Sequence, residues 1–221
     1  MSKPRRLLVV TSTWPLHEGD ARTPFVRNLS HDLARLGWDT MVLAPHAAGA
    51  LTSERHEDVA VRRFRYMPDR WETLAYGAGG VVNMRTPAKK LLALPFVLAE
   101  TAAIEHAALV FRPDIIHAHW LLPQGFCASV PARIHGIPLV TTIHGSDVFA
   151  LRSGLFTPFK KQAIRASSAI TVNSPATRNE AAMLGATTEQ LSMIPMPPAN
   201  EADPAAADLE ANLTIRYQVG G

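Results

Sequence analysis

Polar and titratable side chains follow four predicted strands, at the points where those strands end. The four segments are residues 11–20 (TSTWPLHEGD), 117–120 (HAHW), 144–147 (HGSD) and 173–174 (NS). In an open parallel sheet the carboxyl ends of the strands share one edge, and ligands bind in the crevice outside that edge. We therefore expect these side chains to meet there, and together they predict a site more strongly than any single segment does.

The segment His144-Gly145-Ser146-Asp147 is the most informative of the four. Gly145 permits a tight turn and lets the backbone approach a ligand closely. His144 could exchange a hydrogen bond with a substrate hydroxyl, and Asp147 could orient that histidine or cap the next segment. The alternative is a histidine satisfied by backbone partners inside the turn, and the segment alone does not separate the two.

His117 and His119 lie two residues apart on one predicted strand, so their imidazoles share a face. Metal-dependent hydrolases use this spacing, and His144 and Asp147 could complete such a metal site. The spacing alone favours another arrangement, in which one histidine packs beside Trp120 and the other lines a cleft without a metal.

The loop after the first strand contains a single glycine, Gly19, and no G-x-G-x-x-G pattern. Dinucleotide sites use that pattern to bring the backbone close to a pyrophosphate. Its absence counts against a nicotinamide or flavin cofactor.

Alternating strand and helix patterns must position these side chains. Short apolar runs predict strands buried on both faces, and apolar residues at helical spacing predict helices. The predicted strands are 7–11, 40–43, 59–66 (an edge or outer strand), 114–119, 139–143, 169–172 and 191–194; the predicted helices are 24–36, 86–111, 123–135, 157–166 and 175–184. Thr23, Thr86 and Ser174 each precede a proline and are the predicted starts of three of these helices. The alternation predicts an α/β fold with a doubly wound parallel sheet.

Composition excludes several classes of protein. The chain has 221 residues, 47% hydrophobic and 19% charged, which is too apolar for intrinsic disorder. A mean hydropathy of +0.03 excludes a polytopic membrane protein, and the single Cys127 excludes an internal disulfide or a cysteine-based zinc cage. Only four apolar residues (7–10) follow the basic N-terminus, and the apolar stretch 91–99 is too short to span a bilayer. These features predict a cytoplasmic protein.

Two basic clusters flank aromatic or aliphatic residues. Arg62, Arg63 and Arg65 form one, and Lys89 and Lys90 form the other. A solvated face is the favoured interpretation, and peripheral contact with an anionic inner membrane is the alternative. The net charge of +3 and the lack of a recognition motif give no support for nucleic-acid binding.

Several segments resemble the GT-B glycosyltransferases of family 4. They are 14–15 (WP), 23–29 (TPFVRNL), 42–45 (VLAP), 113–120 (PDIIHAHW), 136–147 (GIPLVTTIHGSD), 169–174 (AITVNS) and 193–196 (MIPM). They follow in order over residues 5–197. The resemblance implies one half of a GT-B architecture: a Rossmann-like domain at 1–197, a linker at 198–212, and at 213–221 the start of a C-terminal domain that is otherwise missing.

The resemblance also implies an activity and its residues. Such enzymes transfer a sugar from a nucleotide-sugar to an acceptor hydroxyl with retention, in polysaccharide or glycolipid assembly, without a metal or other cofactor. The N-terminal domain mostly holds the glycan or glycolipid acceptor, so this chain alone is expected to have little activity. His144 would contact the transferred sugar, and the loop at Gly19 would approach the diphosphate. There, Glu18-Gly19-Asp20 stands where the family often has Gly-Gly. The residues expected to bind substrate are Trp14, Gly19, His119, Trp120, Gly145, Ser146, Asp147, Asn173 and Ser174.

Two other classes of function remain open on the residues alone. One is the metal-dependent hydrolase that uses His117, His119, His144 and Asp147. The other is a non-catalytic module that binds a sugar or a partner protein.

Overall fold

The computed structural model of the chain describes residues 4–17, 20, 22–76, 86–151 and 154–195. Its centre is one sheet with the strand order β3-β4-β2-β1-β5-β6-β7-β8. Neighbouring strands are parallel except β3 and β4, which are antiparallel. The strands are β1 (Arg6–Val10), β2 (Asp39–Pro45), β3 (Ser53–His56), β4 (Val59–Phe64), β5 (Ile115–His119), β6 (Leu139–Ile143), β7 (Ala169–Val172) and β8 (Leu191–Met193).

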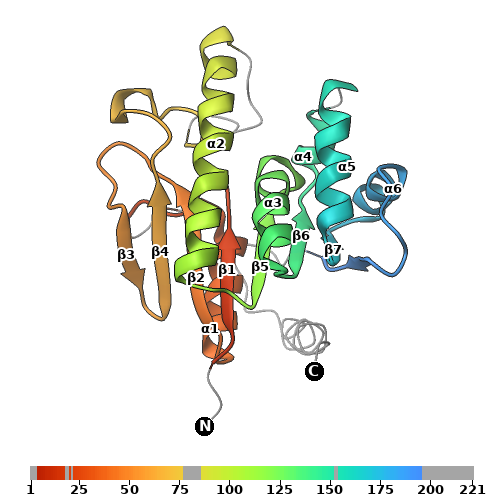
Figure 1. The fold of residues 1–221 in the computed structure, drawn as a ribbon, viewed down its shortest axis with the longest axis horizontal. Helices are drawn as coiled ribbons and strands as arrows, with labels where there is room; N and C mark the ends of the chain where they lie inside the picture. The colour runs from red at the N-terminus through yellow and green to blue at the C-terminus, as the bar shows by residue number, and fades with distance from the viewer. Residues whose placement is uncertain (1–3, 18–19, 21, 77–85, 152–153, 196–221) are drawn as a thin grey trace.

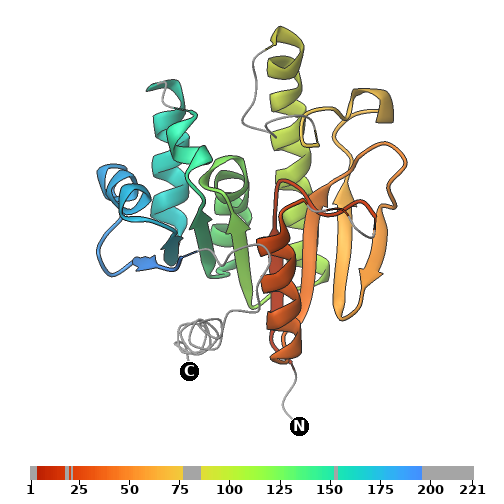
Figure 2. The same cartoon turned by 180° about the vertical axis from the view of Figure 1, so that it is seen from behind.

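Helices lie on both faces of this sheet. They are α1 (Pro24–Arg35), α2 (Pro87–Val110), α3 (Phe126–His135), α4 (Ser146–Phe149), α5 (Thr157–Ala166) and α6 (Pro175–Met183). Figure 1 shows α2, α3 and α5 in front of the sheet, and Figure 2, seen from behind, shows α1 in front. The strand order reverses at β1, which lies between β2 and β5. The predicted doubly wound α/β fold is therefore confirmed. Its topological switch point lies at the carboxyl ends of β1 and β5, the place where sheets of this kind bind ligands.

The two faces of β1 define two core layers. Leu8 packs in the layer that α2 and α3 cover, and Leu7 packs in the layer that α1 covers. Leu7 pairs with Ile115 in the register of β1 and β5. Because side chains alternate along a strand, His117 and His119 lie on the same face as Ile115, toward α1.

Each predicted strand and helix is present, with small shifts at the ends, but some elements were not predicted. The predicted outer strand at 59–66 is β4, the second strand of the sheet, and β3 forms the edge. The sequence of β3, SERH, carries no apolar residue, so neither burial nor hydrophobic alternation marks it. The short helix α4 and the turn η2 (Leu121–Gly125) were also not predicted.

Two of the three predicted N-caps form as expected. The side chains of Thr86 and Ser174 accept hydrogen bonds from backbone N–H groups of the first turns of α2 and α6. Thr23 is a correction: its φ of 44° is left-handed and its side chain makes no cap. Its hydroxyl donates instead to the backbone oxygen of Thr13, at 3.2 Å, which ties the start of α1 to the loop after β1.

Helix α2 is unusually apolar and poorly covered. Over Lys89–Val110 it is long and apolar enough to cross a membrane by length and composition, and 28% of its most apolar window is buried. The exposed fractions of Leu91, Leu94 and Leu98 are 77%, 66% and 61%. The apolar stretch 91–99 ends at Glu100, and the structure places that carboxyl inside the protein. The helix is thus an apolar surface that the described chain leaves open.

Some predictions lie outside the described residues. They are the role of Gly19, the linker at 198–212 and the beginning of a further domain at 213–221. The described part of the predicted loop at 69–85 contains one short helical turn, η1 (Asp69–Trp71).

Candidate functional site

Three histidines from two neighbouring strands form a stacked row on the α1 face of the sheet. His117 and His119 belong to β5, and His144 directly follows β6. The ring centroids of His117 and His119 are 4.3 Å apart, and those of His119 and His144 are 5.3 Å apart. His119 Nδ1 lies 3.1 Å from His144 Nε2, so one ring donates a hydrogen bond to the other. The predicted shared face of the two β5 histidines is confirmed.

Burial keeps this row of histidines neutral. It lowers the pKa of His117 to about 4, and burial together with nearby His117 lowers the pKa of His144 to about 3. Burial and then its two neighbours lower the pKa of His119 well below the ordinary range. At neutral pH the row can therefore donate and accept hydrogen bonds but carries no charge.

The two β5 histidines differ in their partners. His117 Nε2 lies 2.8 Å from Thr142 Oγ1, which in turn lies 2.6 Å from Thr171 Oγ1. His119 Nε2 is buried and has no hydrogen-bond partner within the part of the chain that the structure describes. Such orphaned nitrogens are uncommon in native proteins, and a polar group of a ligand that reached this one would gain a hydrogen bond. His119 is 2% exposed, so such a contact requires neighbouring side chains to move.

Aromatic rings form a wall beside the histidines. The ring of His144 lies 4.6 Å from that of Trp120 and 4.8 Å from that of Phe25 at the start of α1. Trp120 has a φ of +77°, a left-handed conformation that is strained for a bulky residue and is typical of functional sites. Aromatic faces beside hydrogen-bonding imidazoles suit a ligand with an apolar face and a hydroxyl edge, such as a sugar ring.

Asp147 fixes the turn that carries His144. The carboxylate of Asp147 is fully buried and accepts hydrogen bonds from the backbone N–H groups of Leu121, at 2.6 Å, and Gly145, at 2.9 Å. Burial raises the pKa of Asp147 to about 6, although the backbone donors oppose it. Ser146 is exposed at the first position of α4. Asp147 is therefore a positioning residue that joins the end of β5 to the turn after β6.

Asn173 and Ser174 support the same turn from β7. Asn173 Nδ2 donates to the backbone oxygen of His144 at 3.2 Å. The hydroxyl of Thr177 donates to Asn173 Oδ1 at 3.1 Å, and Ser174 Oγ accepts from the backbone N–H of Thr177 at 3.2 Å. Both predicted residues lie beside His144, where these polar atoms hold the turn and the start of α6.

Trp14 lies away from this cluster. Its side chain is 0% exposed in the core that α1 covers, and its ring centroid is 6.4 Å from that of His31. A fully buried ring does not touch a ligand without rearrangement, so this placement gives no support for the predicted contact with substrate.

The acidic residue at the predicted diphosphate loop is turned inward. Asp20 accepts from the backbone N–H groups of Leu16, at 2.9 Å, and Arg22, at 3.1 Å, and pairs with the Arg22 guanidinium at 3.3 Å. Burial acts to raise the pKa of Asp20, but the two backbone donors and Arg22 outweigh it and lower the pKa. The Asp20 carboxylate is thus paired within its own loop.

The hydrolase hypothesis finds no geometric support. Among the described residues, three metal-binding side chains converge within reach of one ion only at His46, Asp69 and Glu72. There His46 already contacts Glu72 and the backbone oxygen of Ala50. Asp147 of the hypothesis directs both carboxylate oxygens to backbone N–H groups instead of joining the histidines.

The arginine cluster is structural. Arg63 is buried and donates to Tyr76 Oη at 3.0 Å. Arg62 contacts a hydroxyl group of β3, and Arg65 pairs with Asp69. Arg62 and Arg63 therefore tie β4 to neighbouring segments, and Arg65 makes a half-exposed ion pair with η1. Lys89 and Lys90 are the remaining basic pair.

Sequence reasoning missed Phe25, Thr142 and Thr177. Phe25 falls within the predicted helix 24–36, and its place in the first turn after the β1 loop puts it at the switch point. Thr142 and Thr177 gave no signal, because threonine is an ordinary residue both on strands and at helix starts.

Comparison with known proteins settles the family. The model described as the glycosyl transferase 4-like domain matches residues 23–197, which includes every element of the histidine site. The chain belongs to this glycosyltransferase family. A Bacillus subtilis (strain 168) protein named for a glycosyltransferase role in teichuronic acid biosynthesis, TuaC, is 41% identical over 64 residues. That match covers 28% of this chain and 16% of TuaC.

Solved structures share the fold at low identity. Sucrose-phosphate synthase from Thermosynechococcus elongatus has a TM-score of 0.63 and 16% identity, over 99% of this chain and 100% of that one. Anabaena HepE in complex with UDP and glucose has a TM-score of 0.53 and 15% identity, over 96% of this chain. UDP-N-acetylglucosamine 2-epimerase from Rickettsia bellii has a TM-score of 0.53 and 9% identity, over 99% of this chain. This chain spans 50% of each of the last two, and its sheet is the Rossmann-like half of a GT-B architecture.

Proposed function

We propose that this chain is the acceptor-side half of a retaining glycosyltransferase that builds a polysaccharide or glycolipid. In the reaction, the bond between the anomeric carbon of a nucleotide-sugar and its diphosphate breaks. The acceptor oxygen forms the new bond to that carbon, and the proton of the acceptor hydroxyl leaves with the nucleoside diphosphate. The observation that carries the proposal is the family match over residues 23–197, which spans the cluster of His119, Trp120 and His144.

The relatives support the substrate classes. The name of the Bacillus protein refers to teichuronic acid, a polysaccharide, and the HepE structures hold UDP, glucose or UDP-glucose. We assign the nucleotide-sugar to this chain as donor substrate and a glycan or glycolipid as acceptor. Residues 1–197 form the acceptor-side domain in this proposal, and the nucleotide is held by a second domain that follows the linker at 198–212.

His144 is proposed to bind the transferred sugar rather than to remove a proton. A histidine whose pKa is about 3 is a poor base at neutral pH, since the best general bases have a pKa near the working pH. As a neutral ring it can still hydrogen-bond a sugar hydroxyl. Trp120 completes the contact surface. His119 positions His144 through the hydrogen bond between their rings, and Asp147, Asn173 and Ser174 hold the same turn.

No metal or other cofactor takes part in the proposed reaction. The leaving diphosphate would be stabilised by backbone and basic groups of the complete enzyme. The same transfer assay with EDTA is therefore expected to give the same rate.

We also propose that the protein works at the cytoplasmic face of the membrane. Lys89 and Lys90 precede Leu91 and Leu94, whose side chains are 77% and 66% exposed. Basic residues beside an apolar helix face favour anionic lipid surfaces. Co-sedimentation with phosphatidylglycerol vesicles, reversed by salt, is the expected result.

The test is sugar transfer by the protein as its native source makes it. We expect His144→Asn to lower kcat/KM for transfer by about 10- to 100-fold, the effect of one lost hydrogen bond to a sugar. His106 is an exposed histidine of α2, on the other face of the sheet from the histidine row. His106→Asn is therefore the matched control and should leave transfer unchanged. Circular dichroism of each variant is the check that its fold is retained.

Three results would contradict parts of this proposal. Failure of the native protein to transfer sugar from any nucleotide-sugar would reject the enzyme and leave a sugar-binding module. Transfer by the 221-residue chain alone would reject its assignment as one half. Stoichiometric zinc together with hydrolytic activity would instead support the hydrolase.

A further inference from the structure

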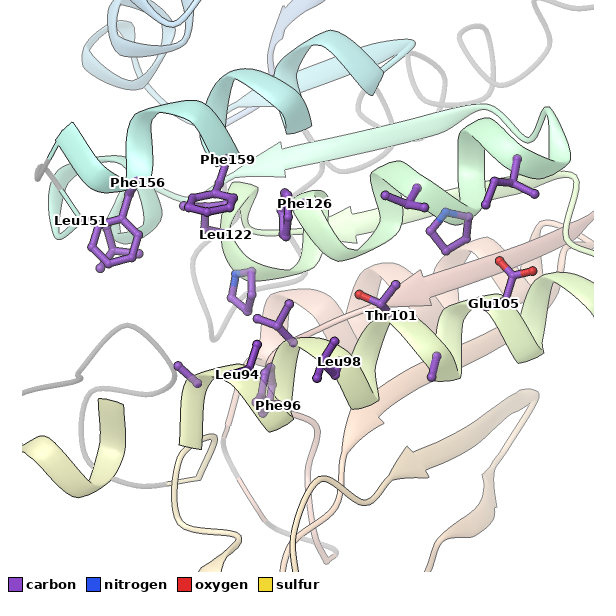
Figure 3. A pocket seen from close by; sticks show the side chains of 17 residues that line it. Leu94, Phe96, Leu98, Thr101, Glu105, Leu122, Phe126, Leu151, Phe156 and Phe159 are labelled. Atoms are coloured by element: carbon purple, nitrogen blue, oxygen red, sulfur yellow. The ribbon is translucent and has the colours of Figure 1, made fainter. Parts of the chain in front are cut away.

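A long apolar groove lies on the face of the sheet opposite the histidines. It has a volume of about 790 Å³ and runs between α2 on one side and α3 and the start of α5 on the other. Figure 3 shows Leu94 and Leu98 of α2 facing Phe126 and Phe159 across it. Of the 17 lining residues, only Thr101 and Glu105 carry polar side chains. The volume lies within the range of pockets that hold small molecules.

The shape of the groove suits one extended chain. Its α2 wall runs from Ala93 to Glu105, which is about 18 Å at the rise of an α-helix. Leu94 and Leu98 are more than half exposed although they line it, so this apolar surface has no cover among the described residues. Contiguous exposed apolar surface of this kind marks a binding site.

The stripe of α2 that lines the groove continues into two cations. Residues four apart share a helix face, so Lys90 precedes Leu94 and Leu98 on one stripe, and Lys89 precedes Ala93. Neither ammonium group has an ion pair or a hydrogen bond within the described chain. The groove therefore combines an apolar channel with unpaired positive charge at the N-terminal end of its α2 wall.

We propose that this groove holds the aliphatic chain of an anionic, lipid-linked acceptor whose phosphate group lies at Lys89 and Lys90. This inference deepens the proposed function and rests on it, because it names the acceptor class. The connection runs through one turn. Trp120 lies beside His144 in the candidate site, and Leu122 and Pro123, which follow it closely in the chain, line the groove. A lipid held there would have its head group at the edge of the sheet where the sugar site opens.

Other occupants fit less well. A flat bilayer would contact the exposed leucines at the rim but would not fill a concave channel between two helices. A second copy of this chain would bring a second pair of lysines to the same groove. An anionic lipid with one chain in the groove satisfies both the shape and the charge.

The test is direct binding of dodecyl phosphate, below its micellar concentration, to the 221-residue chain by isothermal titration calorimetry. One molecule per chain is expected, with affinity falling about tenfold for every two methylene groups removed from the probe. Ala102→Trp places a bulky ring in the groove from an exposed position and should weaken binding by at least about tenfold. Leu109→Trp, exposed on α2 outside the groove, is the control and should bind normally.

A charge variant separates the head group from the chain. Lys89→Gln with Lys90→Gln should weaken dodecyl phosphate about fivefold and leave the binding of uncharged dodecyl glucoside unchanged. Arg178→Gln on α6 is the control of equal charge change per residue. Binding that Ala102→Trp leaves intact, binding without fixed stoichiometry, or a dimer that excludes the probe would each overturn the inference. Since the assay needs no nucleotide-sugar, a failure of sugar transfer would not affect its result.

Discussion

At the scale of single residues, the site depends on burial more than on charge. His117, His119 and His144 stand in a row because β5 and β6 are neighbours, and removal from water makes all three weak bases. A site of this kind recognises a ligand by hydrogen bonds rather than by ionic attraction. That suits a neutral sugar better than an anionic phosphate.

Asp147 is the residue whose loss should disturb this row most directly. In Asp147→Asn one of the two accepting oxygens becomes an NH₂ group that faces a backbone N–H. We expect the free energy of unfolding to fall by about 1–3 kcal/mol, the cost of leaving a buried donor without an acceptor. Urea unfolding measures it. Asp69→Asn, whose carboxylate is half-exposed, is the control, and an equal loss in the two variants would contradict the role given to Asp147.

At the scale of elements, the turn after β6 depends on one glycine. Gly145 has a φ of +104°, a conformation that side chains rarely adopt, although a Cβ there would meet only ordinary contacts at 3.6 Å. We therefore expect Gly145→Ala to lower the free energy of unfolding by about 1 kcal/mol or more through backbone strain alone. Gly154→Ala, at a glycine without positive φ or close neighbours, should be neutral in the same thermal melts. If the two variants melt alike, the turn is not strained.

The elements that sequence reasoning predicted well are those whose burial pattern is repeated. The central strands and the long helices carry it, and the period of two residues placed His117 and His119 on one face. The missed elements lack it. β3 is polar, and α4 owes its position to Asp147, a contact between residues 26 apart that no local pattern encodes. Thr23 has the residue type of an N-cap, but its backbone conformation follows from the loop it closes.

At the scale of the whole molecule, the site exists because the sheet brings distant segments together. Phe25 of α1 reaches His144 across the switch point, and Asn173 reaches it from β7. The sequence predicted the edge at which this happens but not the partners, since those depend on how each loop folds against its neighbour. The groove beside α2 was equally hidden. Its walls come from α2, α3 and the start of α5, and no local pattern encodes how these helices pack against one another.

The free energy of unfolding of the whole molecule should also depend on pH. It should rise with pH below neutrality and fall with pH above it. The buried histidines have folded pKa values below their ordinary 6.5, so the unfolded chain binds more protons and stability falls as the pH falls below 6.5. Glu100 acts in the opposite direction. Burial between α2 and α3 raises its pKa to about 8, so the folded protein keeps a proton that the unfolded chain loses above about 4.5. The histidines of the unfolded chain are half protonated at pH 6.5 and almost all neutral above about 7.5. From about pH 7.5 upward, Glu100 therefore makes stability fall as the pH rises.

Glu100→Gln tests this balance. The amide keeps the shape and can still pair with Gln124, whose Nε2 lies 3.2 Å from Glu100 Oε1, but it does not titrate. Between about pH 7.5 and 8.5 we expect the natural protein to lose up to about 1.4 kcal/mol per pH unit, the value for one proton, and the variant to have a flat profile over that range. Urea unfolding followed by tryptophan fluorescence measures both profiles. Cys127 is buried and is the only cysteine, so its labelling gives an independent measure of unfolded chains.

Glu180→Gln on α6 is the control and should keep the natural slope. Parallel profiles for the natural protein and Glu100→Gln would mean that the buried carboxyl is already ionised in the folded state, and that the α2–α3 layer beneath the groove admits water.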